Sequence, residues 1–181
     1  MSITGTLTLA PAGTWTLDPV HSAVGFEVAY LGGTFKGSFR EIAATLVVGD
    51  ESVSLEGSAE VGSVDVKDEN LAGHLQSPDF FDAERYPEIG FTAKEISLEG
   101  ETVTVEGDLT IKGVTHAADV IGTVTAPLTD PYGRERIGLT LETRVDRTRF
   151  GVSWNNPLPN GEPALANDVT VVAELFFVKS A

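Results

Sequence analysis

The stretch Asp68–Phe91, DENLAGHLQSPDFFDAERYPEIGF, decides the fold, because it interrupts an otherwise continuous β pattern. It begins with Asp68, a good helix N-cap, and Glu69 follows where the helix dipole favours a negative charge. Ser77 precedes Pro78, and a residue before proline avoids the α region, so the helix should end there. The stretch therefore predicts a short helix inserted between two halves of a β chain.

The insert has an apolar face of its own. Leu71, His74 and Leu75 fall at positions i, i+3 and i+4, on one side of a helix. Phe80 and Phe81 follow as an apolar knot. Such an insert could be a lid over one end of a barrel, or it could cap the core of a β sandwich, and these residues leave both open.

Apolar residues alternate with other residues on both sides of the insert, which predicts about eight to ten antiparallel strands. Val24, Phe26, Val28 and Tyr30 share one face of such a run, and Gly32-Gly33 then signals a hairpin turn. Glycines within the strands favour bends and barrel closure, and a barrel of about eight strands can hold one small ligand. These glycines are Gly25, Gly37, Gly57, Gly107, Gly122 and Gly138.

The C-terminal part predicts a strand over Arg147–Trp154, a proline-rich loop over Asn155–Asn167, and a closing strand over Val169–Phe177. Residues 1–13 are small and polar, which is typical of a flexible lead-in. We expect residues 14–181 to form a single domain, since a chain of 181 residues fits one all-β domain.

The composition excludes several classes of function. The chain has a formal net charge of −15, so its surface should repel phosphate backbones and anionic membranes, and we expect no nucleic-acid partner. It has no cysteine, which excludes disulfides, thiolate metal sites and a cysteine nucleophile. The N-terminus does not resemble a signal peptide, and no run approaches the roughly 18 apolar residues of a membrane span. We therefore expect a cytoplasmic protein without stable membrane insertion, or a periplasmic or secreted one if the chain was trimmed.

The polar residues give little support for catalysis or metal binding. His21, His74 and His116 are scattered, without the spacing of a metal site, so we expect no metal and no cofactor. His21 and Ser22 could suggest an esterase, but neighbours on a strand point to opposite faces, and no nucleophile-elbow motif occurs. We expect that the protein is not an enzyme.

Two arginines are the sharper candidates for a polar site. On a strand, Arg147 and Arg149 would share one face. If that face pointed inward near a barrel mouth, both could hold a phosphate or polarise a quinone carbonyl. The alternative, which we favour, is that both form surface ion pairs.

Motifs distributed over nearly the whole chain carry a resemblance to a known family. In chain order they are Trp15–Ser22 with Phe26, Gly33–Phe39, Asn70-Leu71, His74-Leu75, Ser77–Asp82, Tyr86-Pro87, Phe91, Gly107–Thr115, Asp146-Arg147 and Phe150-Gly151. In this order and spacing the chain resembles the YceI-like family of bacterial, lipocalin-like β-barrels that bind polyisoprenoid lipids. It departs from that pattern at His116, where relatives often have lysine, and at Arg149, where an acidic residue is common.

The resemblance implies an eight-stranded antiparallel barrel with a short helix near its mouth. It also implies non-catalytic binding, transport or storage of a long isoprenoid chain, of the polyprenyl or quinone type, in the apolar interior. The expected lining is Phe26, Val28, Phe35, Phe39, Leu75, Phe80, Phe81, Phe91, Leu109, Ile111, Leu141, Phe150 and Trp154, with His74, Arg147 and Arg149 as head-group contacts. The alternative is a filled barrel that acts as a stress-response or interaction protein through its acidic surface. A homodimer is left open.

Overall fold

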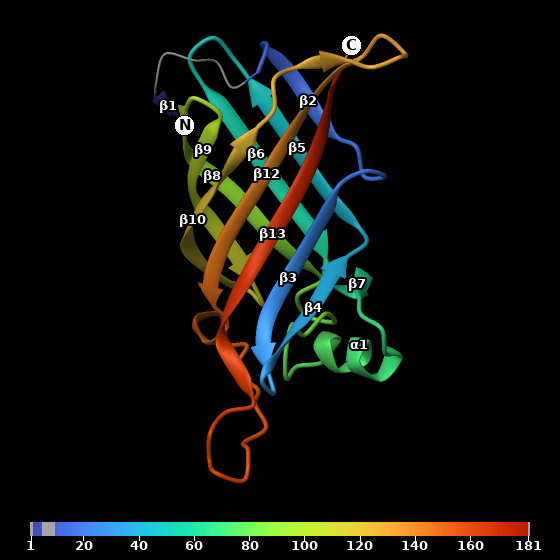
Figure 1. Cartoon of the computed structure of the whole chain (residues 1–181), viewed down its shortest axis with the longest axis vertical. Coiled ribbons are helices and arrows are strands. Elements are labelled where there is room, and N and C mark those ends of the chain that lie inside the picture. Colours follow the sequence, from blue (N-terminus) through green and yellow to red (C-terminus); the bar gives the residue numbers. More distant parts are fainter. Residues whose placement is uncertain (1, 5–9, 181) are drawn as a thin grey trace.

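The computed structural model describes residues 2–4 and 10–180, and strands dominate it (Figure 1). The strands are β1 (Ser2–Thr4), β2 (Gly13–Leu17), β3 (Ala23–Tyr30), β4 (Gly33–Phe39), β5 (Ile42–Val48), β6 (Val53–Glu60), β7 (Val64–Asp65), β8 (Glu88–Glu99), β9 (Thr102–Ile111), β10 (Val114–Val124), β11 (Leu128–Thr129), β12 (Glu135–Asp146) and β13 (Leu165–Lys179). The helices are α1 (Glu69–Gln76) and two short 3₁₀ turns, η1 (Val61–Ser63) and η2 (Arg147–Phe150).

The strands close into an eight-stranded antiparallel barrel, which confirms the predicted fold class. β2 and β3 both pair with β13, so these two strands together count as one strand of the barrel. The next strand is likewise shared, because β5 pairs with β2 and β4 pairs with β3. The order continues through β6, β8, β9, β10 and β12, and the pairing of β12 with β13 closes the ring. Closure leaves few unpaired edges, which explains how such a β-rich chain stays a single sheet.

The helix α1 has the predicted limits. The Asp68 carboxylate accepts hydrogen bonds from the backbone N–H groups of Asn70 and Leu71, at 2.8 and 3.1 Å. Ser77 ends the helix, and its backbone N–H donates to the carbonyl of His74. Figure 1 shows α1 beside β4 and β7 at one end of the barrel, so the insert is not the cap of a sandwich. No helix within residues 2–4 and 10–180 is long and apolar enough to cross a membrane.

A tight hairpin joins β3 to β4 at this same end. Tyr30 pairs with Gly33, so the central turn residues are Leu31 and Gly32, one position before the predicted Gly32-Gly33 signal. Leu31 has φ +47° and Gly32 has φ +81°, as a type I′ turn requires. A leucine in the left-handed region costs about 1–2 kcal/mol, so the sequence places an apolar residue here against the backbone preference.

The predicted strand over Arg147–Trp154 is wrong. Asp146 accepts hydrogen bonds from both the backbone N–H and the hydroxyl of Thr148, and this cap turns the chain into η2. Gly151, at φ +76°, ends the turn. The closing strand also starts earlier than predicted, at Leu165, with a register shift before Val169. Local side-chain capping has here overridden an alternating pattern.

The barrel interior divides into two parts. At the end away from α1, large side chains pack together, and Trp15, Leu46 and Phe177 have no exposed surface. At the α1 end lies a second cluster of buried apolar side chains, which includes Phe39 and Leu75. Of the predicted lead-in, residues 1 and 5–9 lie outside the described part, and Ser2–Thr4 pair in parallel with β8.

Candidate functional site

A cavity of about 340 Å³ occupies the α1 end of the barrel. Its walls come from β3, β4, β6, β8, β9, β12 and β13, and the insert and the η2 segment cover its mouth. The lining residues are Val24, Gly25, Phe26, Val28, Tyr30, Phe35, Phe39, Ala59, Leu71, His74, Leu75, Phe80, Phe81, Ile89, Leu109, Ile111, Val145, Arg147, Phe150, Val152, Trp154, Leu165, Val169 and Val171. Nearly all are apolar, so the cavity suits an apolar guest.

A second cavity of about 150 Å³ continues the first one deeper into the barrel. The two cavities share five lining residues, which form the narrow passage between them: Val24, Ala59, Ile89, Leu109 and Val171. Leu17, Leu55 and Leu175 line the deeper cavity and belong to the packed cluster beyond it. The two cavities, together called the tunnel below, therefore lie in series between the α1 end and the packed cluster around Trp15.

Aromatic rings brace the lid over the mouth. The ring of His74 on α1 packs edge-on against both Phe80 and Trp154, with centroids 5.0 and 4.9 Å away. His74 Nε2 hydrogen-bonds the carboxylate of Asp79 at 3.0 Å. His74 is thus held from both sides by groups of the insert and of the segment after η2.

Two strand glycines make room for aromatic rings inside the barrel. A Cβ atom on Gly37 would lie 2.5 Å from Cζ of Phe26, and one on Gly107 would lie 2.5 Å from Cζ of Phe91. The far end of each ring therefore lies over a glycine, in the space that a Cβ atom would need. The glycines help to keep the interior open, which gives them a more specific role than the bends predicted for them.

The structure brings the expected lining residues together around the two cavities. Phe91 and Leu141 line the deeper cavity, and Leu109 lines both. The remaining residues of the expected lining all face the larger cavity: Phe26, Val28, Phe35, Phe39, Leu75, Phe80, Phe81, Ile111, Phe150 and Trp154. Of the expected head-group contacts, His74 and Arg147 also line it, whereas Arg149 does not.

Sequence reasoning missed several lining residues although the signal was present. Val24 and Tyr30 share one face of β3 with Phe26 and Val28. The expected lining included only Phe26 and Val28. Leu71 likewise shares the helix face of Leu75. The full alternating face, rather than its aromatic members, would have been the better prediction.

Arg147 differs from both of its predicted settings. It is 6 % exposed and lies on η2, so it neither shares a strand face with Arg149 nor forms a surface ion pair. Its guanidinium donates to the carbonyls of Val152, Trp154 and Ala166 at 2.7, 2.9 and 2.8 Å. Burial lowers the pKa of Arg147. The side chain ties η2, the following loop and the start of β13 together at the mouth.

Neighbouring polar groups complete this tie. Arg149 is exposed and approaches His116, whose Nε2–H donates to the Arg149 carbonyl at 2.9 Å. The Lys112 ammonium, at the tip of the β9–β10 hairpin, donates to the carbonyl of Pro78 in the insert at 2.6 Å. It also donates to the carbonyl of Gly151 at 3.2 Å, so it bridges two segments of the mouth.

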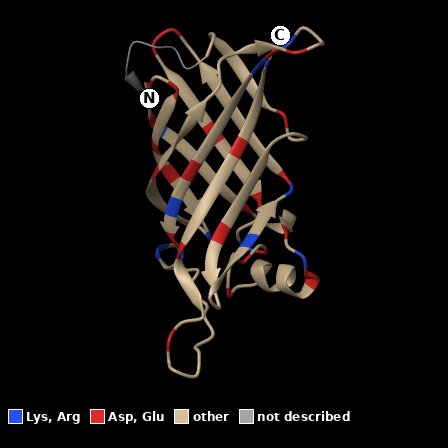
Figure 2. Cartoon of the chain, in the orientation of Figure 1, with Lys and Arg blue, Asp and Glu red and all other residues tan. Residues whose placement is uncertain are grey.

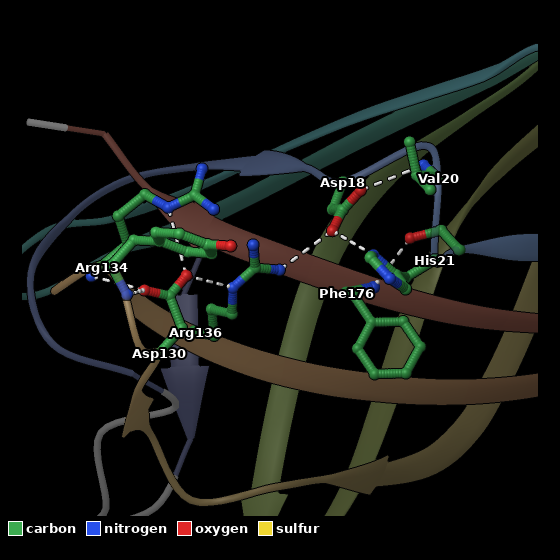
Figure 3. Close-up of polar contacts among 9 residues, drawn as sticks. Asp18, Val20, His21, Asp130, Arg134, Arg136 and Phe176 are labelled. Atoms are coloured by element: carbon green, nitrogen blue, oxygen red, sulfur yellow. Dashed lines mark hydrogen bonds and ion pairs between the residues drawn. The ribbon is translucent and has the colours of Figure 1, made fainter.

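A cluster of charged side chains lies outside both cavities (Figure 3). Arg136 donates to Asp18 at 2.9 Å and to Asp130 at 2.7 Å, and His21 Nδ1 hydrogen-bonds Asp18 at 2.7 Å. The hydroxyl of Ser22 accepts the backbone N–H of Phe176, so it serves the β-sheet edge rather than His21. The cluster clasps the turn between β2 and β3 to β12.

The electrostatics of this clasp favour its charged form. Hydrogen bonding to Arg136, with a smaller contribution from His21, lowers the pKa of Asp18 from 3.8 to about 2. Arg136 also holds the pKa of Asp130 well below its usual range. Within residues 2–4 and 10–180, no group of three or more His, Asp or Glu side chains gathers that could hold a metal ion.

Comparison with known proteins identifies a matching family model and similar proteins. The family model described as the YceI-like domain matches residues 15–177. A UPF0312 protein of Staphylococcus epidermidis is 31% identical over 169 residues, which cover 90% of this chain and 96% of that protein.

Solved structures share the fold. The crystal structure of BcnA from Burkholderia cenocepacia superposes with a TM-score of 0.76 at 22% identity, and covers 88% of this chain and 98% of that one. A polyisoprenoid binding domain from Saccharophagus degradans, implicated in plant cell wall breakdown, gives a TM-score of 0.71 at 15% identity and covers 92% of this chain and 98% of that domain.

Proposed function

The chain belongs to the YceI-like domain family, and we propose that its barrel binds the long apolar tail of a polyisoprenoid lipid without catalysing a reaction. The observation that carries the proposal is the mainly apolar tunnel, with cavities of about 340 and 150 Å³ in series. The polyisoprenoid-binding neighbour from Saccharophagus degradans has the same fold and supports the choice of ligand class.

The size of the cavity favours a bound apolar ligand over an empty interior. Protein interiors contain few voids larger than a water molecule, and an apolar cavity costs about 24 cal/mol per Å³. A dry void of 340 Å³ would therefore cost roughly 8 kcal/mol, which is comparable with the whole stability of a typical domain. An apolar guest removes this cost and buries its own surface at about 25 cal/mol per Å².

The tunnel also suggests how the ligand lies. The deeper cavity is lined mainly by apolar side chains, such as Leu17, Leu55 and Leu175, so it suits the tail. The ionisable side chains His74 and Arg147 line the larger cavity, towards the mouth, whereas the polar residues of the deeper cavity are the hydroxyl-bearing Ser58 and Thr143. We therefore place the head group of a prenyl or quinone ligand at the mouth, beneath the lid formed by the insert.

The direct test is mass spectrometry of an organic extract from freshly purified protein, with a matched blank. A stoichiometric isoprenoid would support the proposal and identify the ligand. A clean extract, together with failure to take up added prenols or quinones, would contradict it and favour an interaction protein with an unused cavity.

A blocking variant tests the location. Ala59 is buried in the passage between the two cavities, so Ala59→Phe should fill the tunnel with a ring that the free space accommodates. We expect uptake of a long prenol to fall at least about tenfold, since each excluded methylene forfeits about 0.8 kcal/mol. Ala117→Phe, at an exposed position on β10, is the matched control and should leave uptake unchanged. Equal uptake by both variants would place the ligand elsewhere.

A further inference from the structure

The hairpin tip between β3 and β4 exposes apolar side chains at the mouth of the cavity. Leu31 is 60% exposed and Tyr30 is 38% exposed. Leu31 occupies a left-handed turn position that asparagine or glycine would fill with less strain. A strained and exposed leucine at such a position is a recognised indication of a functional role.

The tip lies directly beside the entrance to the tunnel. Tyr30 lines the larger cavity and is also more than a third exposed, so the cavity reaches the surface at this residue. The Leu31 backbone N–H donates to the carbonyl of Ala164 at 3.1 Å, which joins the tip to the loop that precedes β13. In Figure 1 this loop extends beyond the tip at the same end of the barrel.

We define the rim patch as the hairpin tip, residues 29–34, together with loop residues 153–161. Neither segment contains an acidic or basic residue, although the whole chain has a net charge of −15 and the loop continues into the exposed Glu162. The hairpins at the opposite end do carry acids, Asp50 and Glu51 in one and Glu99 and Glu101 in another. In Figure 2 the start of α1, which is also acidic, points away from the hairpin tip. The rim patch is thus an uncharged, partly apolar surface that is bordered in the loop by the exposed Glu162.

We propose that the rim patch docks on the surface of a neutral phospholipid bilayer, with Leu31 as the residue that inserts. An uncharged surface suits a zwitterionic bilayer, and the acidic hairpins at the opposite end of the barrel turn towards solvent. Docking in this orientation places the tunnel entrance against the membrane, where a long apolar lipid is available. The purpose of the docking rests on the proposed function, but docking itself can be measured without any isoprenoid.

The experiment measures sedimentation of the full chain with sucrose-loaded phosphatidylcholine vesicles that contain no isoprenoid. We expect the wild type to partition onto these vesicles and Leu31→Asp to reduce the partition coefficient at least about tenfold. Val20→Asp is the matched control: it adds the same charge at a side chain that is 83% exposed on the turn before β3. That turn lies roughly 23 Å from the hairpin tip, from seven steps along β3, so this variant should stay within twofold of the wild type.

The variants are chosen so that folding does not obscure the result. Aspartate and asparagine tolerate φ +47° better than leucine, so Leu31→Asp and Leu31→Asn should retain the wild-type circular dichroism spectrum and melting temperature. Leu31→Asn removes the apolar contact without adding charge and should also lose vesicle binding. If Leu31→Asp and Leu31→Asn bind phosphatidylcholine as the wild type does, the proposal is overturned.

Two further outcomes separate docking from ligand binding. Uptake of a soluble short prenol, measured without vesicles, should be unchanged in Leu31→Asp, and a parallel loss there would show that Leu31 serves the cavity, which overturns docking. Vesicle binding by a wild type that takes up no prenol would support docking and contradict the proposed function. Binding only to anionic phosphatidylglycerol vesicles would overturn the choice of a neutral surface.

Discussion

Replacing Arg136 by methionine should loosen the outer clasp of the barrel in a way that depends on pH. Arg136 donates to Asp18 at 2.9 Å and to Asp130 at 2.7 Å, and the side chains of these acids are only 12% and 7% exposed. The clasp joins the turn between β2 and β3 to β12 (Figure 3). Its loss removes the partner that does most to keep Asp18 ionised.

The magnitude follows from the pKa of Asp18. Its fall from 3.8 to about 2 corresponds to roughly 2.4 kcal/mol, at about 1.36 kcal/mol per pH unit. His21 supplies part of this, and solvent screening near the surface weakens the remainder. We therefore expect Arg136→Met to lower the free energy of unfolding by about 1–2 kcal/mol at pH 7.

The pH dependence has a definite sign. A carboxylate whose pKa is depressed by folding contributes stability above its unfolded pKa of 3.8, and that stability is lost as the pH falls towards about 2. The difference between wild type and Arg136→Met should therefore be constant above about pH 5 and shrink between pH 5 and 2.

Urea denaturation at pH 7 and at pH 2.5 measures both quantities. Arg144→Met, which removes an exposed arginine from the same strand, is the control and should change stability by less than about 0.5 kcal/mol. An Arg136→Met deficit of the same size at both pH values would refute the electrostatic reasoning and assign the effect to packing.

Three other predictions follow from the cavity and its mouth. Gly37→Ala should force the Phe26 ring into the tunnel and weaken long-prenol binding about threefold or more in a dye-displacement assay, whereas binding as tight as wild type would mean that the ring moves elsewhere. Lys112→Met should release the lid and speed ligand dissociation in stopped-flow measurements, with Lys94→Met, an exposed lysine on β8, as the control. Arg147→Met should cost roughly 3 kcal/mol in urea denaturation, because buried carbonyls lose their donors, and a loss below about 1 kcal/mol would contradict that assignment.

Sequence reasoning succeeded where a local sequence signal is compatible with only one local structure. Asp68 and Ser77 delimit α1 because an N-cap carboxylate and a residue before proline are specific. It failed at Arg147, where alternation suggested a strand, because the Asp146 cap on Thr148 was not weighed against that pattern. Capping bonds of a single turn compete with strand pairing, and periodicity alone does not show which one prevails.

The distinction between a filled and a hollow interior could not be predicted from residue types. Phe177 and Phe26 both lie on inward faces of strands, yet Phe177 fills the packed half and Phe26 lines the cavity. The difference lies in the cross-strand partner: Phe26 faces Gly37, which lets its ring lie against the wall, whereas Phe177 pairs with Leu17 and Ile137. Which residue lies opposite each phenylalanine depends on how the strands pair. The sequence alone does not show that pairing, so it does not show which half of the barrel is hollow.

The same register explains why the barrel is hollow at one end only. Residues that close the tunnel, such as Leu17 and Leu175, come from strands that pair with one another around Trp15. At the other end, β4 meets only the two-residue strand β7 before the chain leaves for the insert. The short pairing leaves a gap in the wall that α1 must cover. Entry, lid and cavity therefore share one structural cause, which is the interruption of the sheet by the stretch that begins at Asp68.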